Sequence, residues 1–204
     1  MGKLIPVRAA TDRGAWRLAA AATAVFALAL SLAGLGLPEY AHAIHPVGLR
    51  GASGLPGAWL FDLGAFVLPA ILLLWSSRTF RVALAGAGWP ARIGLVLVQL
   101  SALAFGAQGL LPMDASDLEA SATRLHVLAW MLWWIAFVPG ALLLASGARR
   151  GPAFAVASVL AGLLVPYLAV LAPIGPWVGL AQRLAFGLWF GWWMLAAWRS
   201  ARAA

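Results

Sequence analysis

The sequence predicts an all-α, polytopic membrane protein, with residues 1–204 forming one domain built as a bundle of six transmembrane helices. Of the 204 residues, 64% are hydrophobic and only 10% are charged, and the mean hydropathy is +0.92. A soluble domain carries about 25% charged residues, so this chain lacks the polar surface that water requires. The apolar residues also fall into six long runs, a pattern typical of helices that cross a membrane repeatedly.

The first three predicted spans cover residues 18–37, 58–75 and 93–111. The first holds about twenty apolar residues, enough to cross roughly 30 Å of hydrocarbon. It is longer than the apolar core of a cleaved signal peptide, so we interpret it as a retained helix. Residues 38–57 are too rich in glycine and proline to continue this helix. The second span is apolar except for Asp62, about one turn inside the membrane.

The last three predicted spans cover residues 125–146, 153–171 and 177–198. Pro166 lies within the fifth span and predicts a kink, which is tolerated where neighbouring groups satisfy the freed carbonyl. In the sixth span, Gly187 and Gly191 form a G-x-x-x-G pattern that permits close approach of another helix.

The basic residues predict the orientation of the bundle. Eleven of the fourteen fall on the side of the two termini: Lys3, Arg8, Arg13, Arg17, Arg78, Arg81, Arg92, Arg149, Arg150, Arg199 and Arg202. Because Lys and Arg near span ends resist translocation, both termini are predicted to be cytoplasmic, in a bacterial inner membrane. The net charge of +8 is spread over the span ends and forms no single patch, so no nucleic-acid partner is expected.

The opposite side holds five of the six acids and all three histidines. Its central stretch is residues 106–126, between the third and fourth spans, where Asp114 and His126 are the candidate catalytic residues. A charge facing lipid at mid-membrane would cost at least about 2.5 kcal/mol, so Asp62 and Arg183 are expected to face inward and to pair. The candidate ligand-binding residues on this side are Asp62, Arg183, Gln182, Gln108, Arg124 and His45.

Structural roles compete with these functional ones. An Asp62–Arg183 ion pair could serve only to set helix register, and His126 could be an interfacial residue satisfied by a carboxylate or a backbone carbonyl. Ser116 and Glu119 match a capping box that opens a helix. The inner tryptophans could line a pocket, although packing and lipid contact are the more common roles.

Metal and cofactor chemistry find little support. Three histidines and several carboxylates share one face, and zinc takes four such ligands. However, the histidines lack helical metal-binding spacing, and Pro46 follows His45 directly. The chain has no cysteine, so neither a disulfide nor a thiolate site is possible. No metal and no cofactor are therefore expected.

Three segments resemble a family of six-span prokaryotic membrane proteins known as domain of unknown function 998. They are residues 45–75, a G-x-x-P-x-D pattern at 109–114 that precedes Leu125-His126, and a Gly-Leu-x-(Glu/Gln)-Arg pattern at 179–183. The resemblance implies six helices, implies no established activity, and points to Asp114, His126 and Arg183 as residues to test. Gln182 stands where an acid is more usual in the family.

These observations leave three functional hypotheses, and the sequence does not decide whether the protein is an enzyme. In the first, an outward-facing polar pocket binds a small amphipathic or lipid-like ligand, with membrane lipids as partners. In the second, a membrane-embedded hydrolase or transferase acts on a lipid headgroup, with His126 as general base oriented by Asp114. A small secondary transporter is the third, although we find no internal repeat and no pair of broken helices.

Overall fold

The computed structural model describes residues 7–84, 86–117, 119–147, 151–172 and 175–203, and every regular element in these ranges is helical. Among the basic residues used to predict orientation, Lys3, Arg149 and Arg150 lie outside the described ranges. The elements are α1 Val7–Leu32, η1 Val47–Gly51, α2 Ala58–Asp62, η2 Leu63–Val67, α3 Leu68–Ser76, α4 Arg78–Ala83, α5 Trp89–Gln108, α6 Ser121–Gly147, α7 Pro152–Pro166, η3 Tyr167–Leu171, η4 Gly175–Trp177 and α8 Val178–Ala203.

Five helical stretches are long and apolar enough to cross a membrane: Gly14–Leu32, Ala58–Ala83, Trp89–Gln108, Ser121–Gly147 and Pro152–Leu171. The chain is thus an all-helical, multi-pass membrane protein. The five stretches correspond to the first five predicted spans, although the first ends at Leu32 instead of residue 37. Helix α8 has 26 residues but is not among the five, because Gln182, Arg183 and its tryptophans lower its mean hydropathy.

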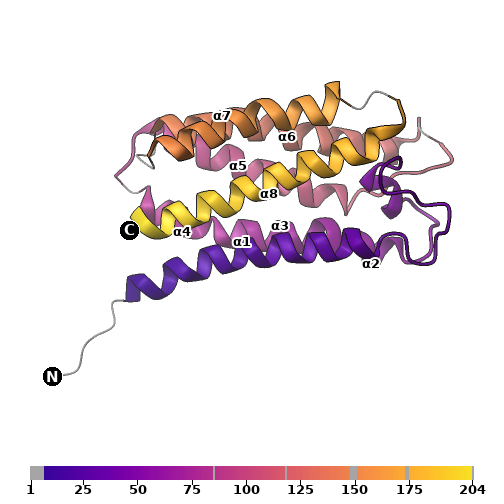
Figure 1. Cartoon of the computed structure of the whole chain (residues 1–204), viewed down its shortest axis with the longest axis horizontal. Helices are drawn as coiled ribbons and strands as arrows, with labels where there is room; N and C mark the ends of the chain where they lie inside the picture. Colours follow the sequence, from indigo (N-terminus) through magenta and orange to yellow (C-terminus); the bar gives the residue numbers. More distant parts are fainter. Residues whose placement is uncertain (1–6, 85, 118, 148–150, 173–174, 204) are drawn as a thin grey trace.

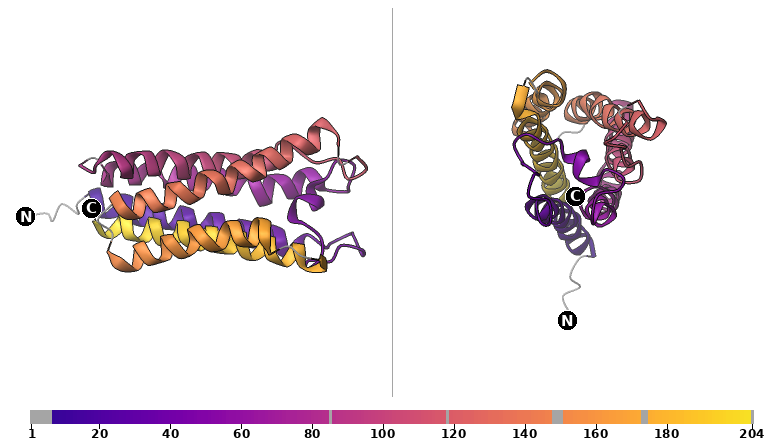
Figure 2. Two further views of the ribbon diagram at one scale, coloured as in Figure 1. Left: turned by 90° about the horizontal axis from the view of Figure 1, so that it is seen from above. Right: turned by 90° about the vertical axis from the view of Figure 1, so that its right-hand side faces the viewer.

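The helices run lengthwise in one bundle, with the start of α1 and the end of α8 at the same end (Figure 1). Helix α8 packs against α1 on one side and α7 on the other, and α5 pairs most extensively with α6. The segment between α1 and α2, drawn in violet, lies across the end of the bundle remote from the termini (Figure 2). We call this the loop end.

Two prolines coincide with changes in helical winding. The wide π turn η2 ends two residues before Pro69, and η3 directly follows Pro166. The missing N–H of Pro69 frees the carbonyl of Ala65, which lies within η2, so it accounts for the first of these changes. That of Pro166 frees the carbonyl of Gly162, which precedes η3, so it does not account for the second. The sequence located the irregularity in the fifth span, whereas the one in the second span was not predicted.

Glycines bring α5 and α6 together. A β-carbon on Gly94 would lie 2.7 Å from the backbone nitrogen of Leu144, and one on Gly140 would lie 2.9 Å from that of Val98. By contrast, a β-carbon on Gly187 or Gly191 would meet nothing within 4 Å. The G-x-x-x-G pattern of the sixth span thus makes no close helix contact within the described chain, and the sequence did not identify the glycines that do.

An aromatic core fills the middle of the bundle. Phe105 and Phe186 are fully buried and stack edge to face, with ring centroids 5.2 Å apart, and Trp133 and Trp189 pack around them. The indole nitrogen of Trp189 donates to Ser101 at 3.2 Å. These inner tryptophans therefore pack the core, and the polar groups that remain gather at the ends of the helices.

Candidate functional site

The candidate site lies at the loop end, where three backbone-anchored contacts fix the loops on the helices. The backbone nitrogen of Val47 donates to Gln182 Oε1 at 2.9 Å, which ties η1 to α8. The nitrogen of Leu180 donates to the Ala43 carbonyl at 2.9 Å, and that of Ser53 to the Met113 carbonyl at 2.9 Å. The loop after α1 is thereby held on α8 at one side and on the α5–α6 connection at the other.

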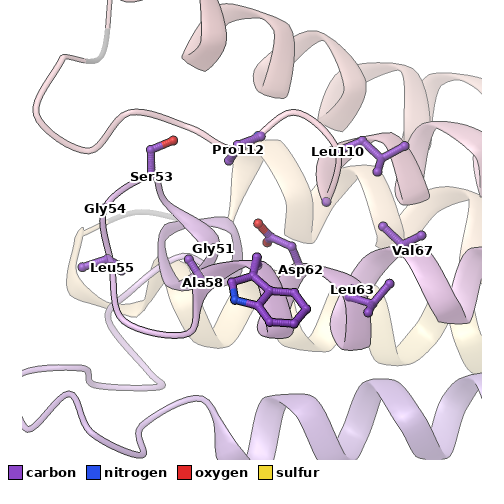
Figure 3. A pocket seen from close by; sticks show the side chains of 12 residues that line it. Gly51, Ser53, Gly54, Leu55, Ala58, Asp62, Leu63, Val67, Leu110 and Pro112 are labelled. Atoms are coloured by element: carbon purple, nitrogen blue, oxygen red, sulfur yellow. The ribbon is translucent and has the colours of Figure 1, made fainter.

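A pocket of about 550 Å³ opens between this loop, the start of the second span and the segment after α5 (Figure 3). Its lining is mainly apolar, and Asp62 is its one charged residue. The lining residues are Gly51, Ser53, Gly54, Leu55, Ala58, Trp59, Asp62, Leu63, Val67, Gly109, Leu110 and Pro112. Leu110, at 69% exposure, and Trp59, at 68%, stand at its open side. Trp59 belongs to α2, whereas Leu110 lies in the segment after α5, so exposed apolar side chains from two parts of the chain border the pocket.

Asp62 is the buried polar group of this pocket, with only 5% of its surface exposed. Its carboxylate points between the loop carrying Ser53 and the segment carrying Pro112 (Figure 3). Within the described ranges it has no hydrogen-bond partner and no cation within 4.0 Å. It packs directly on Gly51, where a β-carbon would collide with both carboxylate oxygens. A glycine is therefore required there for the acid to be accommodated.

Arg50 interacts electrostatically with Asp62 without forming an ion pair. It is 7% exposed, its Nε donates to the Ala33 carbonyl at 2.7 Å, and its guanidinium lies 5.6 Å from the ring centroid of Phe61. Its Nη1 is buried and has no partner among the described residues. Arg50 lies in the glycine- and proline-rich segment 38–57 and was not among the candidate site residues predicted from the sequence. Its position next to Gly51 gave no signal of burial.

Arg183 does not pair with Asp62, contrary to the sequence prediction. Its Nη1 donates to the carbonyls of His45 at 3.0 Å and Gly179 at 2.9 Å, and its Nη2 donates to the Tyr40 hydroxyl at 2.7 Å. Neutral acceptors thus replace the expected carboxylate. Burial raises the pKa of Tyr40, an effect that Arg183 partly offsets, so the phenol stays protonated at neutral pH. Arg183 therefore links α8 to the loop after α1 through hydrogen bonds.

His126 and Asp114, the candidate catalytic pair, are not hydrogen-bonded to each other within the described chain. Nδ1 of the buried His126 lies 2.9 Å from the Leu111 carbonyl, and because a carbonyl only accepts, Nδ1 carries the proton. Asp114 Oδ1 instead accepts from the backbone nitrogen of Ser116 at 2.9 Å and from its hydroxyl at 2.6 Å. These bonds lower the pKa of Asp114. Asp114 is therefore not in position to orient His126 as a general base.

The predicted capping box is also absent among the described residues. The Ser116 hydroxyl is engaged by Asp114, and Glu119 pairs with Arg124 at 2.8 Å, both side chains being largely exposed. Helix α6 begins later, at Ser121. Arg124 is therefore a surface residue: its side chain is exposed, its partner Glu119 lies in the connection between α5 and α6, and it does not line the pocket.

The remaining predicted ligand-binding residues have local roles. Gln108 is buried at the end of α5, and its amide nitrogen has no hydrogen-bond partner among the described residues. His45 accepts from the Ala41 nitrogen at 2.9 Å through Nδ1. Neither residue lines the pocket around Asp62. Within the described ranges, no three His, Asp or Glu side chains gather closely enough to hold a metal ion. The predicted cluster is thus divided into separate groups. Among its described residues, Asp62 lines the pocket beside the first loop, whereas Arg183 borders another hollow of about 500 Å³ between α7 and α8.

Comparison with protein-family models, with curated proteins and with solved structures finds no match for this chain. Its function has to be argued from the geometry at the loop end.

Proposed function

We propose that this chain is a membrane protein that binds an amphipathic ligand in the pocket around Asp62. One observation carries the proposal: a nearly buried carboxylate, without a hydrogen bond in the described chain, faces a cavity of about 550 Å³ with apolar walls. Burying a charged group without a partner is costly, and a ligand that donates to the carboxylate would remove that cost. Such sites hold a ligand by a few polar contacts within an apolar pocket.

The chemistry of the lining defines the ligand class. An ammonium or other hydrogen-bond donor would contact Asp62, since a charge-assisted hydrogen bond to a carboxylate is among the strongest available. An alkyl or acyl portion would lie over Trp59, Leu63 and Leu110, which continue onto the lipid-facing surface. A ligand dissolved in the membrane could therefore enter sideways. A reaction on a lipid headgroup has less support, because His126 and Asp114 are each bound to other groups.

We further infer that α8 is a sixth span and that both termini are cytoplasmic, in a bacterial inner membrane. Helix α8 has 26 residues, or about 39 Å at 1.5 Å per residue, and it runs beside α1 along the bundle. An even number of spans agrees with the position of the two chain ends at one end of the bundle. The basic residues on that side support the cytoplasmic assignment.

Ligand-induced stabilisation tests the binding proposal. The full chain in dodecyl maltoside micelles is heated with added dodecylamine or with dodecanoate, and unfolding is followed by tryptophan fluorescence. At ten times its Kd, the amine should stabilise the protein by about 1.4 kcal/mol. This corresponds to a rise in Tm of about 3–6 °C. Dodecanoate should have no such effect, because the carboxylate repels it.

Asp62→Asn is the decisive variant, and Asp117→Asn removes the same charge from an exposed loop position as its control. Asp62→Asn should keep or raise the basal Tm, since it removes an unpartnered buried charge, and should abolish the response to the amine. Asp117→Asn should respond like the wild-type chain. An equal response of Asp62→Asn and wild type would refute the proposed site.

A further inference from the structure

A second hollow lies at the opposite end of the bundle, near the chain ends. It has a volume of about 450 Å³ and lies between α4 and the first turns of α5. It is lined by Arg81, Leu84, Arg92, Leu95 and Val96. Two guanidinium groups from different helices thus share one cavity with three aliphatic side chains, an arrangement unlike the singly charged pocket at the loop end.

Among the residues whose side chains are described, neither arginine has an acidic partner. Nη2 of Arg81 lies 3.3 Å from Gln99 Oε1, and Gln99 in turn donates to the Ser77 hydroxyl at 2.7 Å, so a short chain of hydrogen bonds orients this guanidinium. Arg92 has neither a hydrogen bond nor an ion pair within the described ranges. The acids whose side chains are described all belong to the loop end: Glu39, Asp62, Asp114, Asp117 and Glu119.

Exposed tryptophans near the hollow indicate that it lies at the depth of lipid headgroups. Trp75, at the end of α3 just before α4, and Trp89, at the start of α5, are strongly exposed. Tryptophans on a membrane protein's surface mark the interface between headgroups and hydrocarbon. Val96, about one turn further along α5 than Arg92, is also exposed. The cations therefore stand where phosphates lie, and the aliphatic lining begins where acyl chains begin.

We propose that this hollow binds an anionic phospholipid from the leaflet on the side of the chain termini, with its phosphate between Arg81 and Arg92. Arginine matches phosphate oxygens with two parallel donors, and basic pockets between membrane helices are suited to such headgroups. Leu84, Leu95 and Val96 contact the upper parts of the acyl chains. The site is separate from the Asp62 pocket and does not depend on the function proposed for it.

Native mass spectrometry of the full chain, titrated with short-chain lipids after purification in detergent, tests the site. Phosphatidylglycerol is the anionic probe and phosphatidylcholine of the same chain length is the zwitterionic one. Glycerol phosphate, added alone, distinguishes a soluble anion from a lipid. The chain should retain phosphatidylglycerol in preference to phosphatidylcholine, and glycerol phosphate should not bind at matching concentrations because it lacks the acyl contacts.

The variants Arg81→Gln and Arg92→Gln should each weaken phosphatidylglycerol binding about fivefold, and the double variant about 25-fold. Arg78→Gln is the matched control, because Arg78 is exposed on the same short helix but does not line the hollow. It should bind like the wild-type chain. An equal loss with Arg78→Gln, no preference between the two lipids, or binding of glycerol phosphate as tight as that of the lipid would overturn the proposal.

Discussion

Replacing Gly109 with alanine tests how tightly the wall of the Asp62 pocket is packed. Gly109 has φ −78° and ψ −13°, which any residue adopts, so alanine brings no backbone strain. Alanine also lowers the conformational entropy of the unfolded chain, which should stabilise the folded state by about 0.4–1 kcal/mol. Its β-carbon, however, would lie 2.7 Å from the Asp62 carbonyl oxygen and 2.8 Å from Phe66 Cβ. Neither atom can rotate away, so the segment must move off the second span. Overpacking costs about 1–3 kcal/mol; taking the middle of both ranges, about 2 kcal/mol lost and about 0.7 kcal/mol gained, leaves a net loss of about 1.3 kcal/mol.

Thermal unfolding in detergent micelles, followed by tryptophan fluorescence, measures this loss. A net change of about 1.3 kcal/mol corresponds to a fall in Tm of about 3–5 °C for a chain of this size. Gly187→Ala is the control, because a β-carbon there meets nothing within 4 Å and helix propensity favours alanine by up to about 1 kcal/mol. Its Tm should be unchanged or higher. If Gly109→Ala behaved like Gly187→Ala, the packing argument would be refuted.

Two further predictions concern the connection between α5 and α6. Arg124→Gln should leave Tm within error, because its pair with Glu119 is exposed and such pairs contribute about 0–1 kcal/mol; a large loss would show that the pair is structural. Ser116→Ala should raise the pKa of Asp114 toward its usual value, as measured by carboxyl NMR titration, because the strongest of the bonds that lower this pKa is removed. Asp114 contributes its full stabilisation above its unfolded-state pKa and loses it as the pH falls through the lowered folded-state value. An unchanged titration in Ser116→Ala would contradict this account.

The fold class could be predicted from the sequence because membrane insertion depends on length and hydropathy, which are local properties. Five of the predicted spans correspond to five long apolar helices, and the irregular winding of η3 begins directly after Pro166. The depth of Asp62, one turn inside the second span, could also be predicted, because it depends only on the position of the residue along the apolar run. The tight packing of α5 on α6 could not be predicted from the sequence, because nothing in the sequence distinguishes Gly94, which lies at that contact, from Gly187, which does not.

Hydropathy and charge by themselves determined that this chain crosses a membrane as helices and that five of its six acids and all three histidines fall on one side. Only the tertiary structure decided which of those groups meet. The path of the loop after α1 brings the Tyr40 hydroxyl and the His45 carbonyl to Arg183, so that its charge is satisfied without an acid. The same path sets Gly51 on Asp62 and leaves that carboxylate facing a cavity. Sequence gives the depth of a side chain along its helix, whereas its partners depend on helix rotation and loop path, which arise only when the whole bundle packs.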